Sequence, residues 1–368
     1  MPTDSTPPRA LLFYTHALAG GGAERVWARL ASGFAARGDR VTFVVDFEAQ
    51  DLASLLTKDV TLKVLPRGHA AATLGLAKLI ASLRPAASLS AISVSNLKHG
   101  VAAGLARRAD RAILSYHGFF DSEPERLSRI GYRLTPVLTR VAGATVAVSH
   151  SLRKDLVERF HAPDARTKMI FNPAAPEPFP APVEPSALAA RPPLLVALGR
   201  LAPDKDFITL LRAFARLANR DARLVILGEG AERARLESEI AALGLAGRVD
   251  MPGFMANPGE VLAKARAFAL TSRREAFSLV CVEALAYGLP IVATDCGGPR
   301  EILDGPALGR IAPVGDIDAI AGALAASLAD PGDPAARRAR ALDFTLEVAL
   351  DGYDRLIRSV VTHARSPG

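Results

Sequence analysis

The sequence predicts an α/β fold with two doubly wound, mostly parallel sheets. Its 368 residues are enough for two domains that each bury their own core. Short apolar runs typical of strands alternate with amphipathic helical patterns in both halves of the chain. Eight prolines between residues 173 and 193 separate the two series and predict a linker. We therefore expect two Rossmann-like domains, with ligands bound in the cleft at the carboxyl ends of both sheets.

The alternation of the first half begins at Ala10 and ends at Phe171. Strands are predicted at Ala10–Tyr14, Val41–Val45, Leu62–Leu65, Leu89–Val94, Ala112–Ser115, Ala144–Val148 and Thr167–Phe171. Helices are predicted from Ala23, near Leu74–Leu83, from Lys98, over about Pro124–Thr139 and over Ser151–Phe160. Because helical segments join most successive strands, we expect a mostly parallel sheet.

The alternation restarts after the prolines. Strands are predicted at Leu194–Leu198, Arg223–Leu227, Val249–Met251, Arg266–Leu270 and Ile291–Ala293, and helices at Phe207–Leu217, Ala231–Leu243, Ser278–Tyr287 and Ile317–Leu328. A last helix, Phe344–Val361, is expected to pack back toward the first domain. The predicted division is an N-terminal domain 1–172, a linker 173–193, a C-terminal domain 194–345 and a C-terminal helix 346–368.

The composition is that of a soluble globular protein, with 49% apolar and 23% charged residues. Cys281 and Cys296 lie in predicted core elements without C-x-x-C spacing, which argues against a disulfide framework or a zinc site and favours a reducing compartment. Residues 1–9 lack the apolar core of a signal peptide, and no run of about 18 uncharged apolar residues occurs. We therefore expect a cytoplasmic protein that does not span a membrane.

The positive charge is concentrated in the first half of the chain. Residues 1–180 carry 23 Lys and Arg against 15 Asp and Glu, whereas residues 181–368 carry 22 against 23. A basic half suggests an anionic partner such as a lipid surface, a diphosphate-linked lipid or nucleic acid. Peripheral contact with the inner face of the plasma membrane therefore stays open. The alternative is a solvated surface in a generally arginine-rich composition.

Gly20, Gly21 and Gly22 precede the first predicted helix. Glycines there allow positive φ and close backbone approach, so a phosphate or an acceptor headgroup could lie at the helix start. A tight turn without ligand is the alternative. The run departs from the dinucleotide fingerprint, because Arg25 stands where its third glycine belongs. This argues against a nicotinamide oxidoreductase, and the chain has no G-K-[ST] sequence of a P-loop either.

Gly199 and Arg200 follow the first strand of the second half, and Lys205 lies five residues after Arg200. Guanidinium and ammonium groups at such a strand–loop–helix step can neutralise a diphosphate. Asp204-Lys-Asp206 and Asp316-Ile-Asp318 each match a D-x-D pattern that can hold a divalent metal. Both precede predicted helices, where Asp is a preferred cap, so we interpret them as caps and predict no metal site.

Two further predicted strands are each followed by candidate nucleotide contacts, namely Gly228 and Gly230 after one strand and Phe254 after the other. These residues could admit the ribose and base of a nucleotide. For Phe254, a place in the hydrophobic core is the alternative. His117 follows a strand of the first half. A lone histidine is more often a structural hydrogen-bonding group, but its predicted position at a carboxyl edge makes His117 a candidate. The weaker candidates are His16, His99 and His150, of which His16 is the best because it precedes the glycine run.

Glu275 and Glu283 stand eight positions apart around the start of the predicted helix Ser278–Tyr287. Small polar residues before this helix could leave its first backbone N–H groups free, which makes a ready anion site. One glutamate would lie in the entering loop and the other about a turn and a half inside the helix, both toward the bound group. The alternative is that Glu275 caps the helix and Glu283 is solvated.

A set of motifs runs in a fixed order along the chain: G-G-G-A-E-R, Y-H-G, G-R-L-x-x-x-K-D-F, L-G-E-G and E-A-F-S-L-V-C-V-E-A-L-A-Y-G-L-P-I-V. In this order the chain resembles the retaining GT-B glycosyltransferases of family 4 type, the group 1 glycosyl transferases, which use nucleotide-activated sugars. The resemblance covers nearly the whole chain and is strongest in residues 195–304. The spacing from Glu275 to Glu283 matches the E-x7-E motif of that family. The resemblance implies a GT-B fold, two Rossmann-like domains facing across a cleft.

The resemblance also implies a role for each matching residue. Arg200 and Lys205 would neutralise the leaving diphosphate, and His117 would lie near the reaction centre on the C6 side of the donor sugar. Glu275 would bind hydroxyls of that sugar, and Glu283 would bind the ribose. The other implied donor contacts are Gly21, Gly22, Gly199, Gly228, Gly230, Phe254 and the backbone N–H groups around Phe277, Ser278 and Leu279.

Two positions depart from the family pattern. Ala276 replaces the usual glycine after the first glutamate, which could tighten the sugar pocket. Asn172-Pro173-Ala174 replaces a common N-G-V sequence after the last strand of the first domain, which concerns the hinge and not the chemistry.

The activity that the resemblance implies is transfer of a hexose with retention, from a nucleotide-diphosphate donor to an acceptor. We expect a UDP-sugar as donor, with no obligatory metal or other cofactor. We expect a glycan or lipid-diphosphate-linked acceptor in cell-surface polysaccharide or glycoconjugate biosynthesis, and no nucleic-acid partner. A GT-B-fold sugar-nucleotide epimerase and a non-enzymatic nucleotide- or glycan-binding module are the alternatives.

Overall fold

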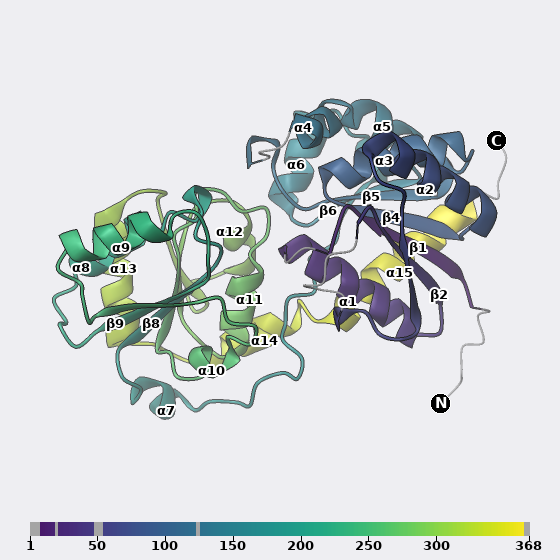
Figure 1. Cartoon of the computed structure of the whole chain (residues 1–368). Coiled ribbons are helices and arrows are strands. Elements are labelled where there is room, and N and C mark those ends of the chain that lie inside the picture. Colours follow the sequence, from purple (N-terminus) through teal and green to yellow (C-terminus); the bar gives the residue numbers. More distant parts are fainter. Residues whose placement is uncertain (1–7, 19–20, 48–53, 123–125, 364–368) are drawn as a thin grey trace, which may run out of the picture. The chain divides into compact units, whose positions relative to one another are not determined.

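The computed structural model describes residues 8–18, 21–47, 54–122 and 126–363. The chain divides into two compact units, a first unit of residues 1–173 with 346–368 and a second unit of residues 174–345. Each unit contains one parallel sheet with helices on both of its faces (Figure 1). The predicted α/β fold with two Rossmann-like sheets is therefore confirmed.

The sheet of the first unit has the strand order β3-β2-β1-β4-β5-β6-β7, and all of its pairings are parallel. Its strands are β1 (Ala10–Thr15), β2 (Arg40–Val45), β3 (Val60–Val64), β4 (Ala87–Ala91), β5 (Ala112–Tyr116), β6 (Ala144–Ala147) and β7 (Thr167–Met169). Its α-helices are α1 (Gly22–Ala36), α2 (His69–Leu83), α3 (Ser93–Leu105), α4 (Arg126–Arg133), α5 (Thr135–Val141), α6 (His150–Glu158) and α15 (Leu346–His363). Short 3-10 turns are η2 (Ala109–Arg111), η3 (Phe120–Ser122) and η4 (Asp164–Arg166).

Alternate residues of β1 build the two sides of the first core. Leu12 and Tyr14 pack with apolar residues of α2 and α3 in one buried cluster. Phe13 points to the other face, where its ring lies 5.4 Å from that of Trp27 and 6.0 Å from that of Phe34 on α1. Residues that point to either face of the sheet are fully buried. The sequence of β1 is therefore a continuous apolar run, as is typical of parallel strands that are covered on both faces.

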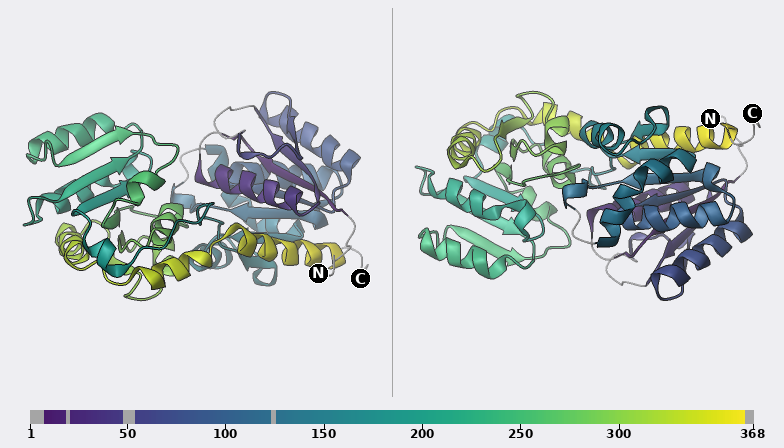
Figure 2. Two further views of the ribbon diagram at one scale, coloured as in Figure 1. Left: turned by 90° about the horizontal axis from the view of Figure 1, so that it is seen from below. Right: turned by 90° about the horizontal axis from the view of Figure 1, so that it is seen from above.

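The C-terminal helix α15 belongs to the first unit and packs against α1 (Figures 1 and 2). Leu350 lies so close to α1 that a side chain at Gly33 would place its Cβ 2.7 Å from Leu350 Cδ1. The ring of Tyr353 lies 5.9 Å from that of Trp27. Glycine at position 33 is therefore what permits the close approach of the two helices.

The sheet of the second unit has the strand order β10-β9-β8-β11-β12-β13 and is also parallel. Its strands are β8 (Leu194–Leu198), β9 (Arg223–Leu227), β10 (Val249–Gly253), β11 (Ala267–Leu270), β12 (Ile291–Thr294) and β13 (Gly309–Ala312). Its helices are α7 (Pro185–Ala189), η5 (Pro203–Lys205), α8 (Phe207–Ala215), α9 (Arg233–Ala242), α10 (Gly259–Leu262), α11 (Leu279–Ala286), α12 (Gly298–Ile302), α13 (Ile317–Ala329) and α14 (Pro334–Leu342). Residues of α8, α9 and α13 form one core cluster with β8, β9 and β11.

The proline-rich segment after Pro173 forms part of the second unit. It contains the short helix α7, which begins at Pro185. Arg338 on α14 donates hydrogen bonds to the carbonyl oxygens of Pro180 (2.7 Å) and Ala181 (3.0 Å). These bonds hold a stretch in which seven of the 20 residues 174–193 are prolines without a backbone N–H against the rest of the unit.

The structure differs from the predicted elements mainly at polar or short segments. The strand predicted at Leu89–Val94 ends at Ala91, and α3 begins at Ser93 instead of Lys98. Ile92 turns the chain with a φ of 67°, a conformation that a β-branched residue rarely adopts and that its sequence does not announce. Among the described residues no helix is both long and apolar enough to cross a membrane.

Candidate active site

The loops after β8 and β11 meet at the point where the strand order of the second sheet reverses. β8 and β11 are neighbours, and the chain continues from them toward opposite edges of the sheet. In parallel α/β sheets, ligands bind outside the carboxyl ends of the strands at such a switch point. The predicted residues Gly199, Arg200 and Lys205 follow β8, and Glu275 follows β11. The fold therefore brings the cations and the first glutamate of the sequence prediction to one edge.

Lys205 and Glu275 form a partly buried ion pair that ties these two loops together. Lys205 Nζ lies 2.6 Å from Glu275 Oε1 and 3.4 Å from Asp204 Oδ2. Burial by itself lowers the pKa of Lys205, but the charge and hydrogen bond of Glu275, followed by those of Asp204, outweigh it and raise the pKa above its ordinary value. Lys205 is therefore a permanent cation in the neutral range, and one of its three N–H donors is left for a ligand.

Glu275 is positioned by its neighbours on both its side chain and its backbone. Ser272 Oγ donates to Glu275 Oε1 at 2.8 Å. The Glu275 backbone N–H donates to the carbonyl oxygen of Cys296 (2.9 Å), and its carbonyl oxygen accepts from the N–H of Gly298 (2.8 Å). Since this carboxylate is bound to Lys205 and Ser272, the alternative that Glu275 caps the following helix is wrong.

The N-terminus of α11 has no side-chain cap. Ser278 is the N-cap residue, but its side chain accepts no capping hydrogen bond. Its buried Oγ has no hydrogen-bond partner among the described residues. The first N–H groups of a helix, here from Leu279 onward, lack intrahelical acceptors, so this uncapped end is suited to an anion.

Glu283 and Phe277 differ in their surroundings. Glu283 lies about one turn inside α11, half-buried, where its charge contributes to a raised pKa of Tyr287 after the larger effect of burial. The Phe277 side chain is buried, with its ring 5.6 Å from that of Phe344, so only its backbone is left for a ligand.

The glycines after β8 and β9 permit these loops to lie against each other. A Cβ on Gly228 would lie 1.9 Å from the Gly199 carbonyl oxygen, and one on Gly230 would lie 2.3 Å from that of Leu201. Both glycines also have positive φ. The packing of these two loops against each other therefore explains why positions 228 and 230 are glycine. Phe254, after β10, is 68% exposed, so its alternative placement in the core is wrong.

Two cations project from the same loops. Arg200 is exposed, and its guanidinium makes no hydrogen bond or ion pair with any described residue. Arg273, directly after Ser272, pairs with Asp206 at 3.1 Å and is 64% exposed. Ser272 and Arg273 were missed by sequence reasoning, although their position directly after a buried strand was a signal for them.

The two D-x-D sequences act at helix starts, as interpreted. Asp206 caps α8 by accepting from the Thr209 N–H (3.4 Å), and Asp316 caps α13 by accepting from the Ala319 N–H (2.9 Å). Within the described ranges, no group of three or more His, Cys, Asp and Glu side chains is placed to hold a metal ion.

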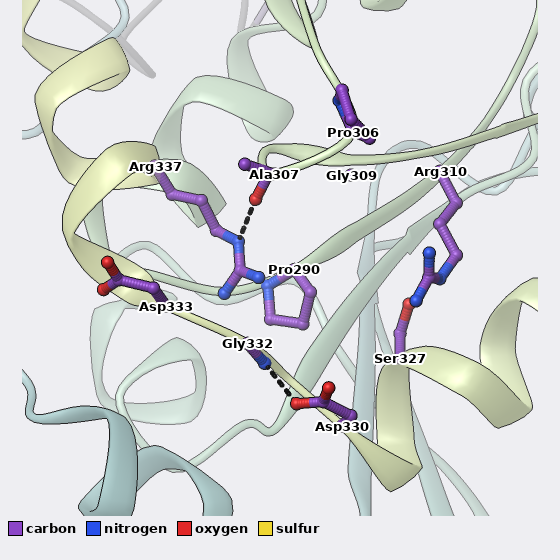
Figure 3. Close-up of a pocket in the computed structure, with 10 residues that line it drawn as sticks. All are labelled: Pro290, Pro306, Ala307, Gly309, Arg310, Ser327, Asp330, Gly332, Asp333 and Arg337. Carbon is purple, nitrogen blue, oxygen red and sulfur yellow. Dashed lines mark hydrogen bonds between the residues drawn. The ribbon is translucent and has the colours of Figure 1, made fainter.

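A pocket of about 150 Å³ lies elsewhere in the second unit, beside the amino ends of β12 and β13 (Figure 3). The buried Arg337 guanidinium crosses it and donates to the carbonyl oxygens of Ala307 (3.1 Å) and Gly288 (2.9 Å). Burial lowers the pKa of Arg337 to about 10. Because each of the three guanidinium nitrogens donates to a backbone carbonyl oxygen, the third to that of Pro331, we interpret the pocket as structural.

In the first unit, His117 follows β5 directly. Its Nε2 lies 3.0 Å from Ser115 Oγ, which in turn lies 3.2 Å from the Tyr353 hydroxyl of α15. The edge of the Trp27 ring packs against the imidazole, with centroids 5.7 Å apart. Burial lowers the pKa of His117 to about 3, and its buried Nδ1 has no partner among the described residues. His117 is therefore a neutral group that can donate or accept one further hydrogen bond.

Gly21 and Gly22 begin α1, and Gly20 lies outside the described residues. Gly21 is the N-cap with a φ of −79°, so positive φ is not what selects glycine here. A Cβ at this position would lie 2.0 Å from Glu24 Oε2. The start of α1 thus already has a carboxylate of the chain itself, which occupies the position favoured by an anion.

The three other histidine candidates, His99, His150 and His16, lie in different surroundings. His99 is fully buried between Ser88 and Ser90, with 2.8 Å from each ring nitrogen to a hydroxyl, and burial lowers its pKa to about 3. His99 is therefore a structural residue. His150 is the first residue of α6, and its ring packs edge-on against that of Phe171. His16 belongs to a different network at the end of β1.

Two family models together match most of the chain. Residues 182–342 match the family described as Glycosyl transferases group 1, and residues 20–177 match Glycosyltransferase Family 4. The chain belongs to the group 1 and family 4 glycosyltransferases. Its loops after β8 and β11 therefore belong to the group 1 domain, and His117 belongs to the family 4 domain.

Curated relatives of this glycosyltransferase match over shorter stretches. The GDP-mannose-dependent alpha-mannosyltransferase of Mycobacterium tuberculosis is 38% identical over 132 residues, which are 34% of this chain and 32% of that protein. The N-acetylgalactosamine-N,N'-diacetylbacillosaminyl-diphospho-undecaprenol 4-alpha-N-acetylgalactosaminyltransferase of Campylobacter jejuni is 33% identical over 177 residues, 46% of this chain and 48% of that protein. The matches thus span half or less of these relatives.

Solved structures match over nearly the whole glycosyltransferase. Anabaena HepE in complex with UDP-glucose has a TM-score of 0.80 and 21% identity, covering 95% of this chain and 100% of that one. The lipopolysaccharide outer core galactosyltransferase WaaB has a TM-score of 0.77 and 19% identity, covering 95% and 99%. At these identities the likeness shows the shared fold.

The lowered pKa of His117, a residue of intermediate burial, predicts an acid-sensitive first unit. An unfolded histidine takes up a proton near pH 6.5, whereas the folded His117 does so near pH 3, so acid favours unfolding between these values. The wild type should lose stability between about pH 7.5 and 5. Replacing His117 by Gln should make that loss about 2 kcal/mol smaller, as measured by urea denaturation at the two pH values. His99 contributes equally to the pH dependence of both proteins, so its effect cancels in the comparison. An equal loss of stability in wild type and variant would contradict the assignment.

Proposed function

We propose that the chain transfers a hexose from a nucleotide-diphosphate donor, a UDP-sugar, to a glycan or lipid-linked acceptor with retention of configuration. The observation that supports this most is the Lys205–Glu275 pair beside the uncapped start of α11. A cation, a carboxylate and free helix N–H groups at one edge match a ligand that has a diphosphate next to a polyhydroxylated ring.

The proposed roles follow from what each group can offer. Arg200 is exposed and unpaired in the described structure, so its fork of N–H donors is available to diphosphate oxygens. Lys205 adds a point charge, and the backbone N–H groups of Ser278 and Leu279 add the helix end. Glu275, with one oxygen held by Lys205 and Ser272, offers the other to sugar hydroxyls. Glu283, further along α11, is assigned to the ribose.

The proposed reaction is a front-side displacement. The bond from the anomeric carbon to the donor phosphate oxygen breaks, and the acceptor oxygen bonds to the same face of that carbon. The acceptor proton passes to the leaving phosphate oxygen, and Arg200, Lys205 and the helix end stabilise the charge that develops there. These groups supply the positive charge themselves, so we propose that no metal ion is obligatory. Activity that EDTA abolishes and Mg²⁺ restores would contradict this point.

The donor base and the acceptor are proposed from the relatives. HepE, a structural neighbour, was solved with UDP and with UDP-glucose, whereas the mannosyltransferase relative is named as GDP-mannose-dependent. We propose UDP and keep GDP as the alternative. The acceptor class rests on the Campylobacter relative, which is named for a diphospho-undecaprenol-linked glycan, and on the Rhizobium relative, which is named for lipopolysaccharide core biosynthesis. A role in cell-surface polysaccharide or glycoconjugate biosynthesis is the corresponding proposal.

The kinetic test compares three variants with one control. Arg200→Ala should lower kcat/KM by about 100-fold, because a preorganised donor to the developing charge contributes about 3 kcal/mol. Glu275→Ala should lower kcat with a small change in donor affinity, and Glu283→Ala should mainly weaken donor binding. The matched control is Arg235→Ala, an exposed arginine on α9 that should change nothing.

The assay measures nucleotide release with and without a lipid-linked acceptor, and identifies the sugar product. Unchanged kcat/KM in Arg200→Ala would contradict the role of that residue. Epimerised sugar nucleotide as the product would indicate the epimerase instead, and nucleotide binding without turnover would indicate a binding module.

The exposed side of α4 and α5 supports a proposed contact with the anionic inner face of the plasma membrane. We call it the α4–α5 face; it consists of Arg126, Arg129, Ile130, Arg133, Leu134, Val137, Arg140 and Val141. Its four aliphatic side chains are 37% to 59% exposed and recur at helical spacing. Residues 126–141 include no Asp or Glu. Arginines around exposed aliphatic side chains are the pattern of a surface that lies on anionic lipid.

Vesicle flotation tests the α4–α5 face. Wild type should float with vesicles containing anionic phosphatidylglycerol, less so as salt increases, because the electrostatic part is screened. Replacing Val137 and Val141 together by Asp should reduce binding at least about fivefold, since about 1 kcal/mol is lost for each charge placed against the surface. Val314→Asp, which changes an exposed valine of the second unit, is the control. Absence of binding by the wild type at low salt would refute the proposal.

A further inference from the structure

A second buried charge network lies at the switch point of the first sheet. The strand order of this sheet reverses between β1 and β4. Tyr14 and His16 lie at the end of β1, Asp46 follows β2 directly, and Lys98 lies on α3, the helix that follows β4. Of these residues only His16 is among the candidates expected from the sequence, as the best of the three weaker histidines. The network is independent of His117, which follows β5.

Asp46 is the centre of this network. Its Oδ1 accepts a hydrogen bond from the Tyr14 hydroxyl at 2.8 Å. Its Oδ2 lies 2.6 Å from His16 Nδ1 and also accepts a short hydrogen bond from Lys98 Nζ. Burial alone raises the pKa of the Asp46 carboxyl, but the hydrogen bonds of His16, Lys98 and Tyr14 outweigh it and lower the pKa. Asp46 is therefore an anion whose oxygens are fully used by the chain.

The network fixes the orientation of the His16 ring. His16 Nδ1 lies 2.6 Å from Asp46 Oδ2 and 3.3 Å from Lys98 Nζ. We assign a proton to Nδ1 because its shorter contact is with the carboxylate, which leaves Nε2 as the ring's remaining group for a ligand. Asp46 and Lys98 side chains are 8% and 4% exposed, whereas that of His16 is 27% exposed. His16 is thus the part of the network that solvent or a ligand can reach.

Two exposed aromatic rings flank His16. The centroid of the Phe47 ring lies 5.1 Å from that of His16, with an angle of 88° between the ring planes. The His69 ring stacks on the His16 ring, with a centroid distance of 6.1 Å and an interplanar angle of 28°. Phe47 is 44% exposed, and His69 begins α2 at the surface. Rings beside an oriented hydrogen-bonding nitrogen provide both apolar contact and direction, as small-molecule sites require.

The charge balance of the network indicates what kind of ligand it fits. The Lys98 ammonium is already neutralised by Asp46, so the network offers no free cation to a phosphate. A neutral, hydroxyl-rich ligand fits such an edge better than an anion does.

We propose that His16, Phe47 and His69 form a carbohydrate subsite that binds the neutral acceptor sugar. A sugar hydroxyl donates to His16 Nε2, and the ring of the sugar packs on Phe47 and His69. Tyr14, Asp46 and Lys98 are positioning residues that fix the tautomer and orientation of His16. This inference rests on the proposed function, because it names where its acceptor binds.

The test uses the full chain without donor and a panel of methyl glycosides, namely glucoside, galactoside, mannoside, rhamnoside and the two N-acetylhexosaminides. In saturation-transfer NMR, at least one glycoside should bind the wild type, and Phe47→Ala and His16→Ala should each weaken that binding at least about fivefold. His363→Ala and Leu74→Ala are matched controls at exposed positions and should retain it. Long-range proton–nitrogen spectra should show His16 protonated at Nδ1, with Nε2 shifting on addition of the glycoside.

UDP binding and UDP release in the absence of acceptor separate this inference from the proposed function. His16→Ala and Phe47→Ala should retain UDP binding, because the proposed donor site lies in the second unit. If no glycoside binds the wild type, or if binding is equal in the wild type and both variants, the inference is overturned while UDP turnover still supports the proposed function. If UDP neither binds nor is released, the proposed function itself fails.

Discussion

The arrangement of the second unit depends on one ion pair at the carboxyl edge of its sheet. Lys205 and Glu275 lie in loops that follow the adjacent parallel strands β8 and β11, and their contact of 2.6 Å connects those loops. Burying two charges is costly unless other groups complete their hydrogen bonds. Ser272 does so for Glu275, and Asp204 adds to the field at Lys205. The chain thus holds both charges in place before a ligand arrives, as electrostatic preorganisation requires.

The first unit places a comparable lysine–carboxylate pair at the switch point of its own sheet, with a different outcome. Lys98 and Asp46 neutralise each other below the surface, and only His16 is presented to solvent. In the second unit, Arg200 and Arg273 are exposed beside the pair. The same topological position thus presents the exposed Arg200 guanidinium in one unit and the His16 imidazole in the other. This difference is the basis for proposing an anionic donor at the second unit and a neutral acceptor sugar at the first.

Much of the fold follows from sequence, because buried parallel strands are short apolar runs and the helices between them are amphipathic. The candidate site of the second unit follows for the same reason, since Arg200, Lys205 and Glu275 lie in the loops after such runs. What the sequence does not reveal is pairing between distant residues. Asp46 and Lys98 are 52 positions apart, and nothing local indicates that a lysine inside a helix is buried. Short elements such as α12 and α14 were also not predicted, because their positions depend on packing and not on a helical repeat of apolar residues in the sequence.

The central claim is that the edge formed by Lys205, Glu275 and the start of α11 binds a diphosphate. Calorimetric titration with the nucleoside, monophosphate and diphosphate of uridine and of guanosine tests it most directly. For the preferred base, the diphosphate should bind about 10- to 100-fold more tightly than the monophosphate, because charge-assisted hydrogen bonds to the second phosphate are worth about 1.5–3 kcal/mol. Equal affinities for monophosphate and diphosphate, within about twofold, would contradict the account.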